Sequence, residues 1–309
     1  MDELPRFWNA IINPRAFRGK SHLYWSKVKS ELWEHGFTFK VCDSPSSEKC
    51  NEIVSHLVRE GETNFLVVGG DGTLNEVVNA LLVSGADLNQ ILVGVIPSGT
   101  GNDWARTHNI SRKPSDIVEM FKKGRIFSHD IGKVTIISEK DEKCRYFINI
   151  AGLGFDAEVI LRIQQTGQEV HNNKFIYLKN LFRALKDNRP VKCRFIFSDH
   201  EHELPIFTIA AGICKYNGNG MKPVPMADPS DGMLDVVYVE YMKGFEFYRK
   251  LPFFLKGKHI GMKKVYHVRT KHVEIIPEST MYVETEGELV GCGKFLIENT
   301  ELKLRILIP

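Results

Sequence analysis

The chain has 309 residues, of which 43% are hydrophobic and 26% are charged, the balance of an ordinary globular protein with a substantial core. The formal net charge of +3 suits contact with a polyphosphate or an anionic membrane surface, but it is too small for a protein that wraps nucleic acid. The longest apolar run, at 204–213, has about half of the roughly 20 residues that a membrane span needs. Six scattered cysteines without a Cys-x-x-Cys pair are typical of reduced thiols in a cytoplasmic protein. Since no apolar run is long enough to span a membrane, we expect a soluble protein whose membrane contact is peripheral.

Apolar strand patterns alternate with helical patterns over the first 110 residues. The expected strands lie at 7–14, 37–41, 64–70 and 91–97, and the expected helices at 20–35, 48–60 and 71–83. Strands that are apolar on both faces and are separated by helices favour a parallel, doubly wound α/β sheet.

The pattern changes after residue 127. β-branched and aromatic residues alternate in segments bounded by turn residues, at 132–138, 144–152, 191–198, 203–216, 233–241, 263–278, 281–291 and 302–309. Only two helical patterns interrupt them, at 173–188 and 244–257. We therefore expect an antiparallel β domain after an α/β domain.

A glycine-rich elbow follows the third expected strand, in the stretch Gly-Gly-Asp-Gly-Thr-Leu-Asn-Glu. Gly69, Gly70 and Gly72 let backbone amides approach an anion at the positive end of the next helix. Thr73 and Glu76 have capping-box spacing, so a plain glycine turn with a helix cap remains an alternative. Asp71 favours a metal-chelated polyphosphate, because a carboxylate among amides can approach Mg²⁺.

A second elbow of similar composition follows the fourth expected strand, and Thr100 and Asp103 again have capping-box spacing. It consists of Ser98, Gly99, Thr100, Gly101, Asn102 and Asp103. Two such loops at the carboxyl ends of parallel strands are expected to face one ligand, with 13–20 as a third loop. The sequence contains no P-loop motif, and the Gly-x-Gly-x-x-Ala string at 152–157 lies outside a βαβ context.

These motifs, together with 149–159, 217–236, 257–259 and 286–288, resemble the diacylglycerol kinase catalytic-domain family. That family includes soluble bacterial lipid kinases and is related to sphingosine and ceramide kinases. The resemblance runs from about residue 6 to the last residue. It implies an α/β nucleotide domain at 1–127, a β-sandwich lipid domain at 128–299 and an active site between them, with 300–309 returning to the first domain.

The resemblance also implies roles for individual residues. Asn13 and Ser44 would contact the nucleotide, although Ser44 stands where the family usually has threonine. The ATP site would comprise Asn13, Ser44, Gly69, Gly70, Asp71, Gly72, Thr73, Leu74, Asn75, Glu76, Ser98, Gly99, Thr100, Asn102, Asp103 and Glu288. Phe17, which replaces a glycine of the family loop, is a further departure.

A structural Mg²⁺ site is implied at Asp228, Asp231 and Met233. Asp231 would give its carboxylate and the other two residues their backbone carbonyls. Oxygen ligands in a tight Asp-Gly turn suit a hard cation. A plain hairpin turn is the alternative.

The catalytic base is expected in the turn at 285–288. Bacterial members have aspartate where this chain has Glu286. The extra methylene moves the carboxylate by about one bond length, and misplacements of that order cost roughly 10²-fold in rate. Either Glu286 is the base and the acceptor sits farther back, or Asp71 takes the role. An ordinary acidic turn is the third reading.

Residues 248–259 place apolar side chains between cations and suit an anionic headgroup layer. The apolar residues are Leu251, Phe253, Phe254 and Leu255, and the cations are Arg249, Lys250, Lys256 and Lys258. A core helix ended by Gly257 is the alternative reading of the phenylalanines. The apolar face of 175–185 is expected to pack against the sheet.

We therefore expect an ATP- and Mg²⁺-dependent lipid kinase that phosphorylates a hydroxyl of diacylglycerol or of a similar lipid, such as a sphingoid base, ceramide or phosphatidylglycerol. Its partner is a lipid presented at a membrane surface, and a homodimer is left open. NAD kinase, which shares the Gly-Gly-Asp-Gly loop, is the alternative enzyme. A nucleotide- or lipid-binding regulator that has lost its base is the second alternative.

Overall fold

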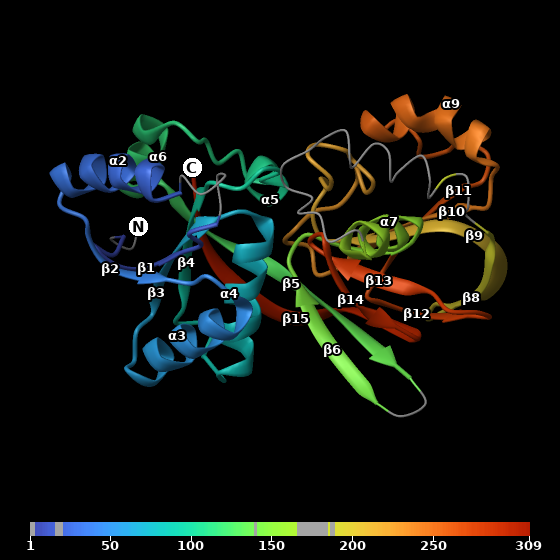
Figure 1. Ribbon diagram of the computed structural model, residues 1–309, viewed down its shortest axis with the longest axis horizontal. Helices are drawn as coiled ribbons and strands as arrows, with labels where there is room; N and C mark the ends of the chain where they lie inside the picture. Colours follow the sequence, from blue (N-terminus) through green and yellow to red (C-terminus); the bar gives the residue numbers. More distant parts are fainter. Residues whose placement is uncertain (1–3, 16–20, 139–140, 166–184, 186–188) are drawn as a thin grey trace. The chain divides into compact units, whose positions relative to one another are not determined.

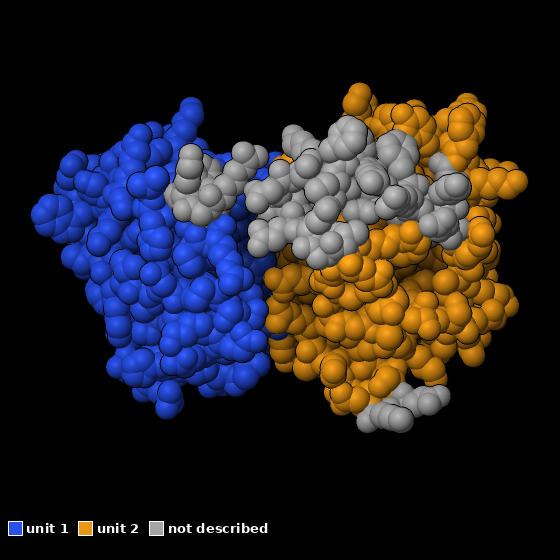
Figure 2. Space-filling model, viewed as in Figure 1, with its two compact units in different colours: residues 1–129, 302–309 blue, residues 130–301 orange. Residues whose placement is uncertain are grey.

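The computed structural model describes residues 4–15, 21–138, 141–165, 185 and 189–309. The chain divides into two compact units, which Figure 2 distinguishes by colour. Unit 1 comprises Met1–His129 and Leu302–Pro309, and unit 2 comprises Asp130–Glu301. Both boundaries fall within strands, β5 (Arg125–Ile137) and β15 (Lys294–Ile308). Among the described residues, no helix has the length and apolar character to cross a membrane.

Unit 1 is a doubly wound α/β structure, as the alternating sequence pattern predicts (Figure 1). Its strands lie in the order β15-β4-β3-β1-β2 and neighbouring strands are parallel. The remaining elements are β1 (Phe7–Ile12), α2 (Ser21–Glu34), β2 (Thr38–Asp43), α3 (Ser47–Arg59), β3 (Asn64–Gly69), α4 (Asp71–Val83), β4 (Leu92–Pro97), α5 (Asp103–Thr107) and α6 (Pro114–Lys123).

Burial on both faces of the sheet explains this arrangement. All six residues of β4 are buried, as are five of the six in β3, so helices must cover the sheet on both sides. Helices α2 and α6 pack together on one face, and α3 and α4 pack together on the other (Figure 1). The rings of Trp8 and Phe37 both contact Phe121 of α6, with centroids 5.3 and 5.4 Å away.

Unit 2 is built on an antiparallel sheet, as predicted. The path β14-β13-β7-β9-β8-β12-β15 forms its main part, while β10 pairs with β9 and β11, and β5 with β6. The further elements are β6 (Glu142–Phe147), β7 (Ile150–Gly154), α7 (Phe155–Gln165), β8 (Val191–Ile196), β9 (Glu201–Gly212), β10 (Leu234–Glu240), α9 (Gly244–Leu255), β11 (Val265–Thr270), β12 (His272–Pro277), β13 (Tyr282–Thr285) and β14 (Glu288–Cys292).

The helices of unit 2 differ in part from the expectation. Helix α9 confirms the pattern at 244–257, whereas α7 was not predicted, although Phe155, Val159 and Ile163 have helical spacing and are buried. Most of the expected helix at 173–188 lies outside the described residues. Its Leu185 is buried in the core with Phe247 of α9.

Candidate functional site

Four of the predicted nucleotide-binding segments begin where parallel strands of unit 1 end. Asn13 follows β1, Ser44 follows β2, Gly70 follows β3 and Ser98 follows β4. Because these strands are parallel, all four segments lie at one edge of the sheet. In the sheet, β2 is the neighbour of β1 on one side and β3 is its neighbour on the other, so the direction of the chain across the sheet reverses after β2. A reversal of this kind is where open α/β sheets bind ligands.

The two glycine elbows contact each other through their backbones. A Cβ atom added to Gly99 would lie 2.4 Å from the Gly70 Cα, and one added to Gly70 would lie 2.9 Å from the Gly99 Cα. The Ser98 amide also donates to the Gly69 carbonyl at 2.8 Å. Close approach therefore explains why glycine occupies both positions, and the two elbows form one structure.

Asp71 joins the same two elbows through its side chain. Its Oδ2 accepts a hydrogen bond from the Asp103 amide at 3.0 Å, and its Oδ1 accepts one from the Trp104 amide at 2.9 Å. These amides open α5, so Asp71 caps that helix from a distance of 32 residues in sequence. Burial raises the pKa of the Asp71 carboxyl above its ordinary value, and the two amides oppose that shift. Each oxygen retains a further lone pair that can face a cation.

The capping-box interpretation of both elbows is wrong. Gly70 caps α4 and Asn102 caps α5, and neither makes a side-chain capping bond. Asn102 instead closes its own loop, because it accepts from the Gly99 amide and donates to the Gly99 carbonyl, both at 2.9 Å. Thr73 Oγ1 accepts from Asn13 Nδ2 at 3.0 Å.

Some of the remaining predicted nucleotide residues lie close to these elbows, and others are engaged in contacts of their own. Ser98 Oγ is fully buried and has no hydrogen-bond partner among the described residues. The Ser44 amide donates to the Ile12 carbonyl at 2.8 Å, which fixes the loop after β2 beside the end of β1. Glu76 is engaged elsewhere, since it accepts from Ser47 Oγ at 2.5 Å, and Asp103 pairs with Arg106.

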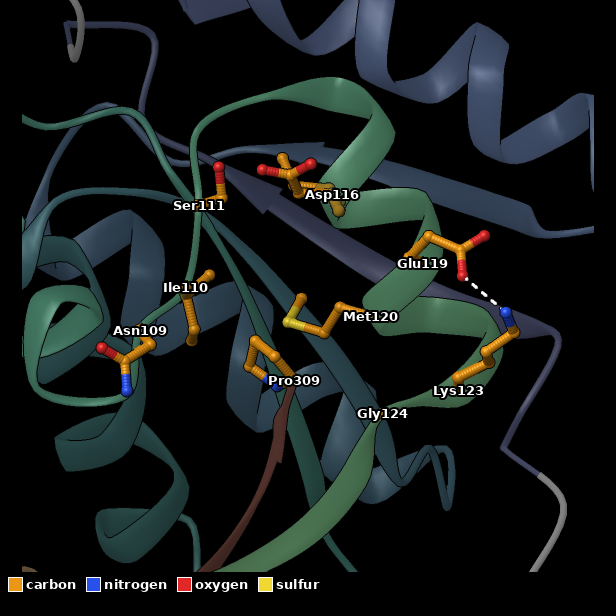
Figure 3. A pocket seen from close by; sticks show the side chains of 10 residues that line it. Asn109, Ile110, Ser111, Asp116, Glu119, Met120, Lys123, Gly124 and Pro309 are labelled. Atoms are coloured by element: carbon orange, nitrogen blue, oxygen red, sulfur yellow. Dashed lines mark ion pairs between the residues drawn. The ribbon is translucent and has the colours of Figure 1, made fainter.

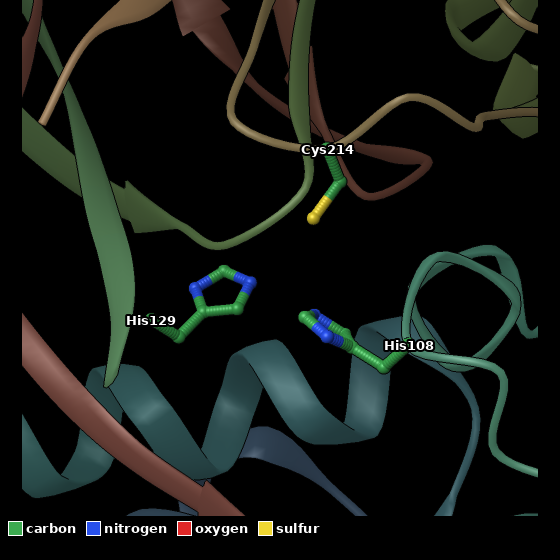
Figure 4. Close-up of side chains that lie close together, drawn as sticks. All are labelled: His108, His129 and Cys214. Atoms are coloured by element: carbon green, nitrogen blue, oxygen red, sulfur yellow. The ribbon is translucent and has the colours of Figure 1, made fainter. Parts of the chain in front are cut away.

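A cluster of aromatic rings anchors α5 beneath the second elbow. Trp104 Nε1 donates to His129 Nε2 at 3.1 Å. The rings of His108 and His129 lie side by side with centroids 5.1 Å apart (Figure 4). Burial and the neighbouring His129 lower the pKa of His108 to about 2, so this ring is neutral at physiological pH. The cluster gives α5 a fixed position.

In unit 2, Glu286 occupies a two-residue turn between β13 and β14. Glu286 and Gly287 both have positive φ, 53° and 82°, which is the geometry of a type I′ hairpin turn. A left-handed glutamate is uncommon, and such strain is concentrated at functional sites. Glu286 Oε1 accepts from the amides of Ile148 and Asn149 at 3.2 and 2.8 Å, so the carboxylate is held in place.

Two acidic residues beside this turn were missed in the sequence. Glu284 is only 2% exposed, and its Oε2 accepts from the Gly287 amide at 2.7 Å. Burial and the charge of Asp156 raise the pKa of Glu284 to about 8, and burial raises the pKa of Asp156 to about 6. The sequence signal that could have indicated Glu284 was a glutamate within a short expected strand, directly after the apolar Val283. Glu288, predicted at the nucleotide, pairs with Arg145 at 3.3 Å.

The predicted Mg²⁺ ligands share one loop, but protein groups already engage them. Asp228 Oδ1 accepts from the Ser230 amide and hydroxyl. Asp231 accepts from the Met233 amide at 2.9 Å and forms an ion pair with Arg269. The Met233 carbonyl accepts from Asn299 Nδ2 at 3.4 Å. The donor set as it stands fits a divalent cation poorly, because a guanidinium neutralises the carboxylate expected to bind it.

A hollow of about 350 Å³ lies elsewhere in unit 1, beside α6 (Figure 3). Its lysine, Lys123, is paired with Glu119 at 3.0 Å. The hollow contains none of the predicted binding residues. It is lined by Asn109, Ile110, Ser111, Asp116, Ile117, Glu119, Met120, Lys123, Gly124 and Pro309.

Two family models match the chain. Residues 8–134 match the diacylglycerol kinase catalytic domain, and residues 149–307 match the YegS C-terminal NAD kinase beta sandwich-like domain. A diacylglycerol kinase of Bacillus subtilis is 28% identical over 97% of this chain and 95% of its own length. A diacylglycerol kinase of Mycobacterium tuberculosis is 28% identical over 86% of this chain and 84% of its own.

The fold also matches solved structures. The crystal structure of a diacylglycerol kinase from Bacillus anthracis superposes with a TM-score of 0.70 at 17% identity, over 98% of this chain and 97% of that one. At this identity the likeness concerns the fold. It agrees with an α/β domain followed by a β-sandwich-like domain, as the sequence predicts.

Proposed function

The chain belongs to the family of kinases that combine a diacylglycerol kinase catalytic domain with a YegS-type C-terminal domain, and from this membership we propose that it transfers the γ-phosphate of ATP to a hydroxyl of diacylglycerol or a similar lipid. The observation that carries the proposal is the junction of the two elbows at Gly70, Gly99 and Asp71. It supports a preformed phosphate site at a helix N-terminus.

The donor nucleotide would bind at the edge of the sheet in unit 1. The α4 N-terminus favours a phosphate, Asn13 contacts the elbow at Thr73, and Ser44 lies beside the end of β1. The buried Ser98 hydroxyl has an unused donor that a phosphate oxygen would satisfy. Mg²⁺ would arrive with ATP and neutralise its phosphates, as phosphoryl transfer requires.

Glu286 is the better candidate for the base. The Asp71 carboxylate accepts from the two amides that open α5 and so already joins the two elbows. The Glu286 carboxylate lies on a hairpin turn with positive φ and is oriented by the amides of Ile148 and Asn149. In the proposed step, Glu286 takes the proton of the lipid hydroxyl and the hydroxyl oxygen bonds to the γ-phosphorus. The bond from that phosphorus to the bridging oxygen breaks, and ADP leaves.

The lipid would be reached by peripheral contact of α9 with an anionic membrane surface in the cytoplasm. Phe247 lies in the core with Leu251 and Phe254 packed against it. The opposite face exposes Phe245, Tyr248 and Phe253, which are 74, 54 and 47% exposed. One face of the helix therefore packs in the core, and the exposed face supports the proposed membrane contact. Aromatic side chains accompanied by the exposed cations Arg249 and Lys256 suit a headgroup layer.

Labelled ATP, offered with vesicles that contain one candidate lipid each and separately with NAD, tests the function. Phosphorylated lipid that is lost in Glu286→Gln and kept in Glu274→Gln, an exposed strand glutamate of unit 2, supports the proposal. Phosphorylated NAD would establish the NAD kinase alternative. ATP binding without transfer to any lipid or to NAD would establish the regulator.

A further inference from the structure

A pair of carboxyl groups, buried Glu284 and half-buried Asp156, lies beside the turn that carries Glu286. Glu284 on β13 is paired in register with Gly152 on β7. A Cβ atom on Gly152 would lie 2.4 Å from Glu284 Oε1 and 3.4 Å from the Asp156 Cβ. Glycine at position 152 therefore leaves the space into which the Glu284 carboxyl fits, next to Asp156 at the start of α7.

Glu284 is bonded directly to the turn. Its Oε2 accepts from the Gly287 amide at 2.7 Å, the residue after Glu286. The Asn217 side chain also donates to Glu284, and the Thr208 hydroxyl, which donates to the Leu153 carbonyl, lies beside Asp156. Because the turn has only two residues, a bond to one of them restrains the backbone of the other.

We propose that Glu284 is the positioning residue for Glu286, and that a single proton held by the Glu284–Asp156 pair keeps the turn in place. This deepens the proposed function, because it assigns a second acid to the site that carries the base. Two carboxylates this close cannot both ionise without repelling each other. Loss of the proton at alkaline pH would place two negative charges over Gly152, and repulsion from Asp156 would displace the Glu284 carboxylate together with the Gly287 amide that it binds.

The charges around Glu284 act in both directions. Asp156 on α7 and Glu288 on β14 raise its pKa, in addition to burial, while the Gly287 amide and the Asn217 side chain lower it. Arg145 pairs with Glu288 at 3.3 Å and so moderates that residue's charge. Burial and Asp156 outweigh the hydrogen bonds, which favours the protonated form of Glu284 at neutral pH.

The Gly287 amide reports on the pair without any need for activity. Glutamate labelled with ¹³C at the carbonyl, combined with ¹⁵N-glycine, selects Glu-Gly dipeptides, and the chain has two, Glu60-Gly61 and Glu286-Gly287. The Glu60→Gln variant removes the first signal and so identifies the second. In proteins that keep Glu60, the Gly61 signal from unit 1 is the internal control.

We expect the Gly287 signal to titrate above neutral pH in the parent protein. Glu284→Gln should abolish that titration, and Asp156→Asn should lower its midpoint by about one pH unit or more, because it removes the neighbouring charge. Asp235→Asn, which alters a buried carboxyl paired with His267 in the same unit, should leave the midpoint unchanged. A titration that persists in Glu284→Gln, or a midpoint unaffected by Asp156→Asn, would overturn the proposal.

Kinetics separate positioning from a merely structural role. If Glu284 positions the base, lipid phosphorylation should decline at alkaline pH in the parent, and Glu284→Gln should lose that limb of the kcat profile while keeping the KM for ATP. Glu284→Ala should lower kcat about tenfold or more, because small misplacements of a base are costly. A uniform loss with an unchanged pH profile would contradict the proposal. If the parent phosphorylates no lipid, the proposed function fails and the Gly287 titration still decides the role of the pair.

Discussion

The carboxylate of Asp71 accepts hydrogen bonds from the amides of Asp103 and Trp104, the first two residues of α5. It thereby joins the first glycine elbow to the second. Asp71→Asn replaces one acceptor oxygen by an amide donor that faces a backbone N–H. We expect a loss of about 1 kcal/mol or more in the free energy of unfolding, because a partly buried hydrogen bond is replaced by two donors that face each other. ATP affinity should fall with it. Denaturant unfolding and calorimetric ATP titration measure both, with Asp116→Asn in the exposed first turn of α6 as the control. Unchanged unfolding would contradict the structural role of Asp71.

The contact between Gly70 and Gly99 predicts a strong effect of a single methyl group. Gly99→Ala would place its Cβ 2.4 Å from the Gly70 Cα, so one elbow must move, at a cost of about 1–3 kcal/mol. We expect weakened ATP binding even where the protein remains folded. Gly85→Ala is the comparison, since its Cβ would meet open space and carries only the cost of a left-handed backbone, roughly 1–2 kcal/mol. Equal ATP affinity in both variants would show that the elbow contact is dispensable.

Protonation of Glu284 predicts how stability varies with pH. Its pKa is raised from 4.5 to about 8 in the folded protein, so between these values the folded state binds more protons than the unfolded state. Stability should therefore fall as pH rises through this window. Glu284→Gln cannot ionise, and its melting temperature should depend less on pH and exceed that of the parent near pH 8. Parallel curves for the two proteins, measured by calorimetry across this window, would refute the assignment.

The exposed face of α9 predicts vesicle binding that depends on both aromatic side chains and charge. Phe245→Ser combined with Phe253→Ser should weaken binding to anionic vesicles about tenfold or more, since a buried phenylalanine contributes roughly 1.5–3 kcal/mol. High salt should weaken the parent as well, because it screens Arg249 and Lys256. Leu23→Ser in unit 1 is the matched control, as Leu23 is 73% exposed. Sedimentation with vesicles measures all of these, and unaltered binding of the double variant would exclude this face.

The ion pair between Asp231 and Arg269 predicts an unusual response to metal removal. A chelator should leave the melting temperature of the nucleotide-free protein unchanged, because the guanidinium already neutralises the carboxylate. Arg269→Ala removes that cation and should make the loop gain stability from added Mg²⁺. A melting temperature that rises with Mg²⁺ in the parent would instead support the metal site predicted at Asp228, Asp231 and Met233.

The fold was predictable because the local pattern of apolar residues indicates which segments are buried. The short apolar runs of β3 and β4, bounded by turn residues, favour strands covered on both faces, and elbows that follow parallel strands share one edge of the sheet. The capping boxes failed for a local reason. Threonine at position 73 has the right spacing, but Gly70, three residues earlier, packs against Gly99 and takes the cap position itself.

Contacts between distant residues were not predictable. Nothing near Asp71 in the sequence indicates the amides 32 residues away that it binds. Glu284 was overlooked because alternation in a four-residue strand is too short to distinguish an inward acid from an outward one. The pairing of Asp231 with Arg269 likewise joins residues 38 apart. Individual motifs therefore located the candidate site, and tertiary contacts redefined what several of its residues do.

The last strand has a consequence for how the protein is made. Arg305 and Ile306 of β15 pair with Leu92 and Val93 of β4, so residues translated after all of unit 2 complete the sheet of unit 1. On the ribosome, β4 must wait with an open edge while some 200 further residues are synthesised, as follows from its end at Pro97 and the return at Leu302. An open edge is a template for wrong pairing. Unit 1 thus begins first in the sequence but is completed last during synthesis.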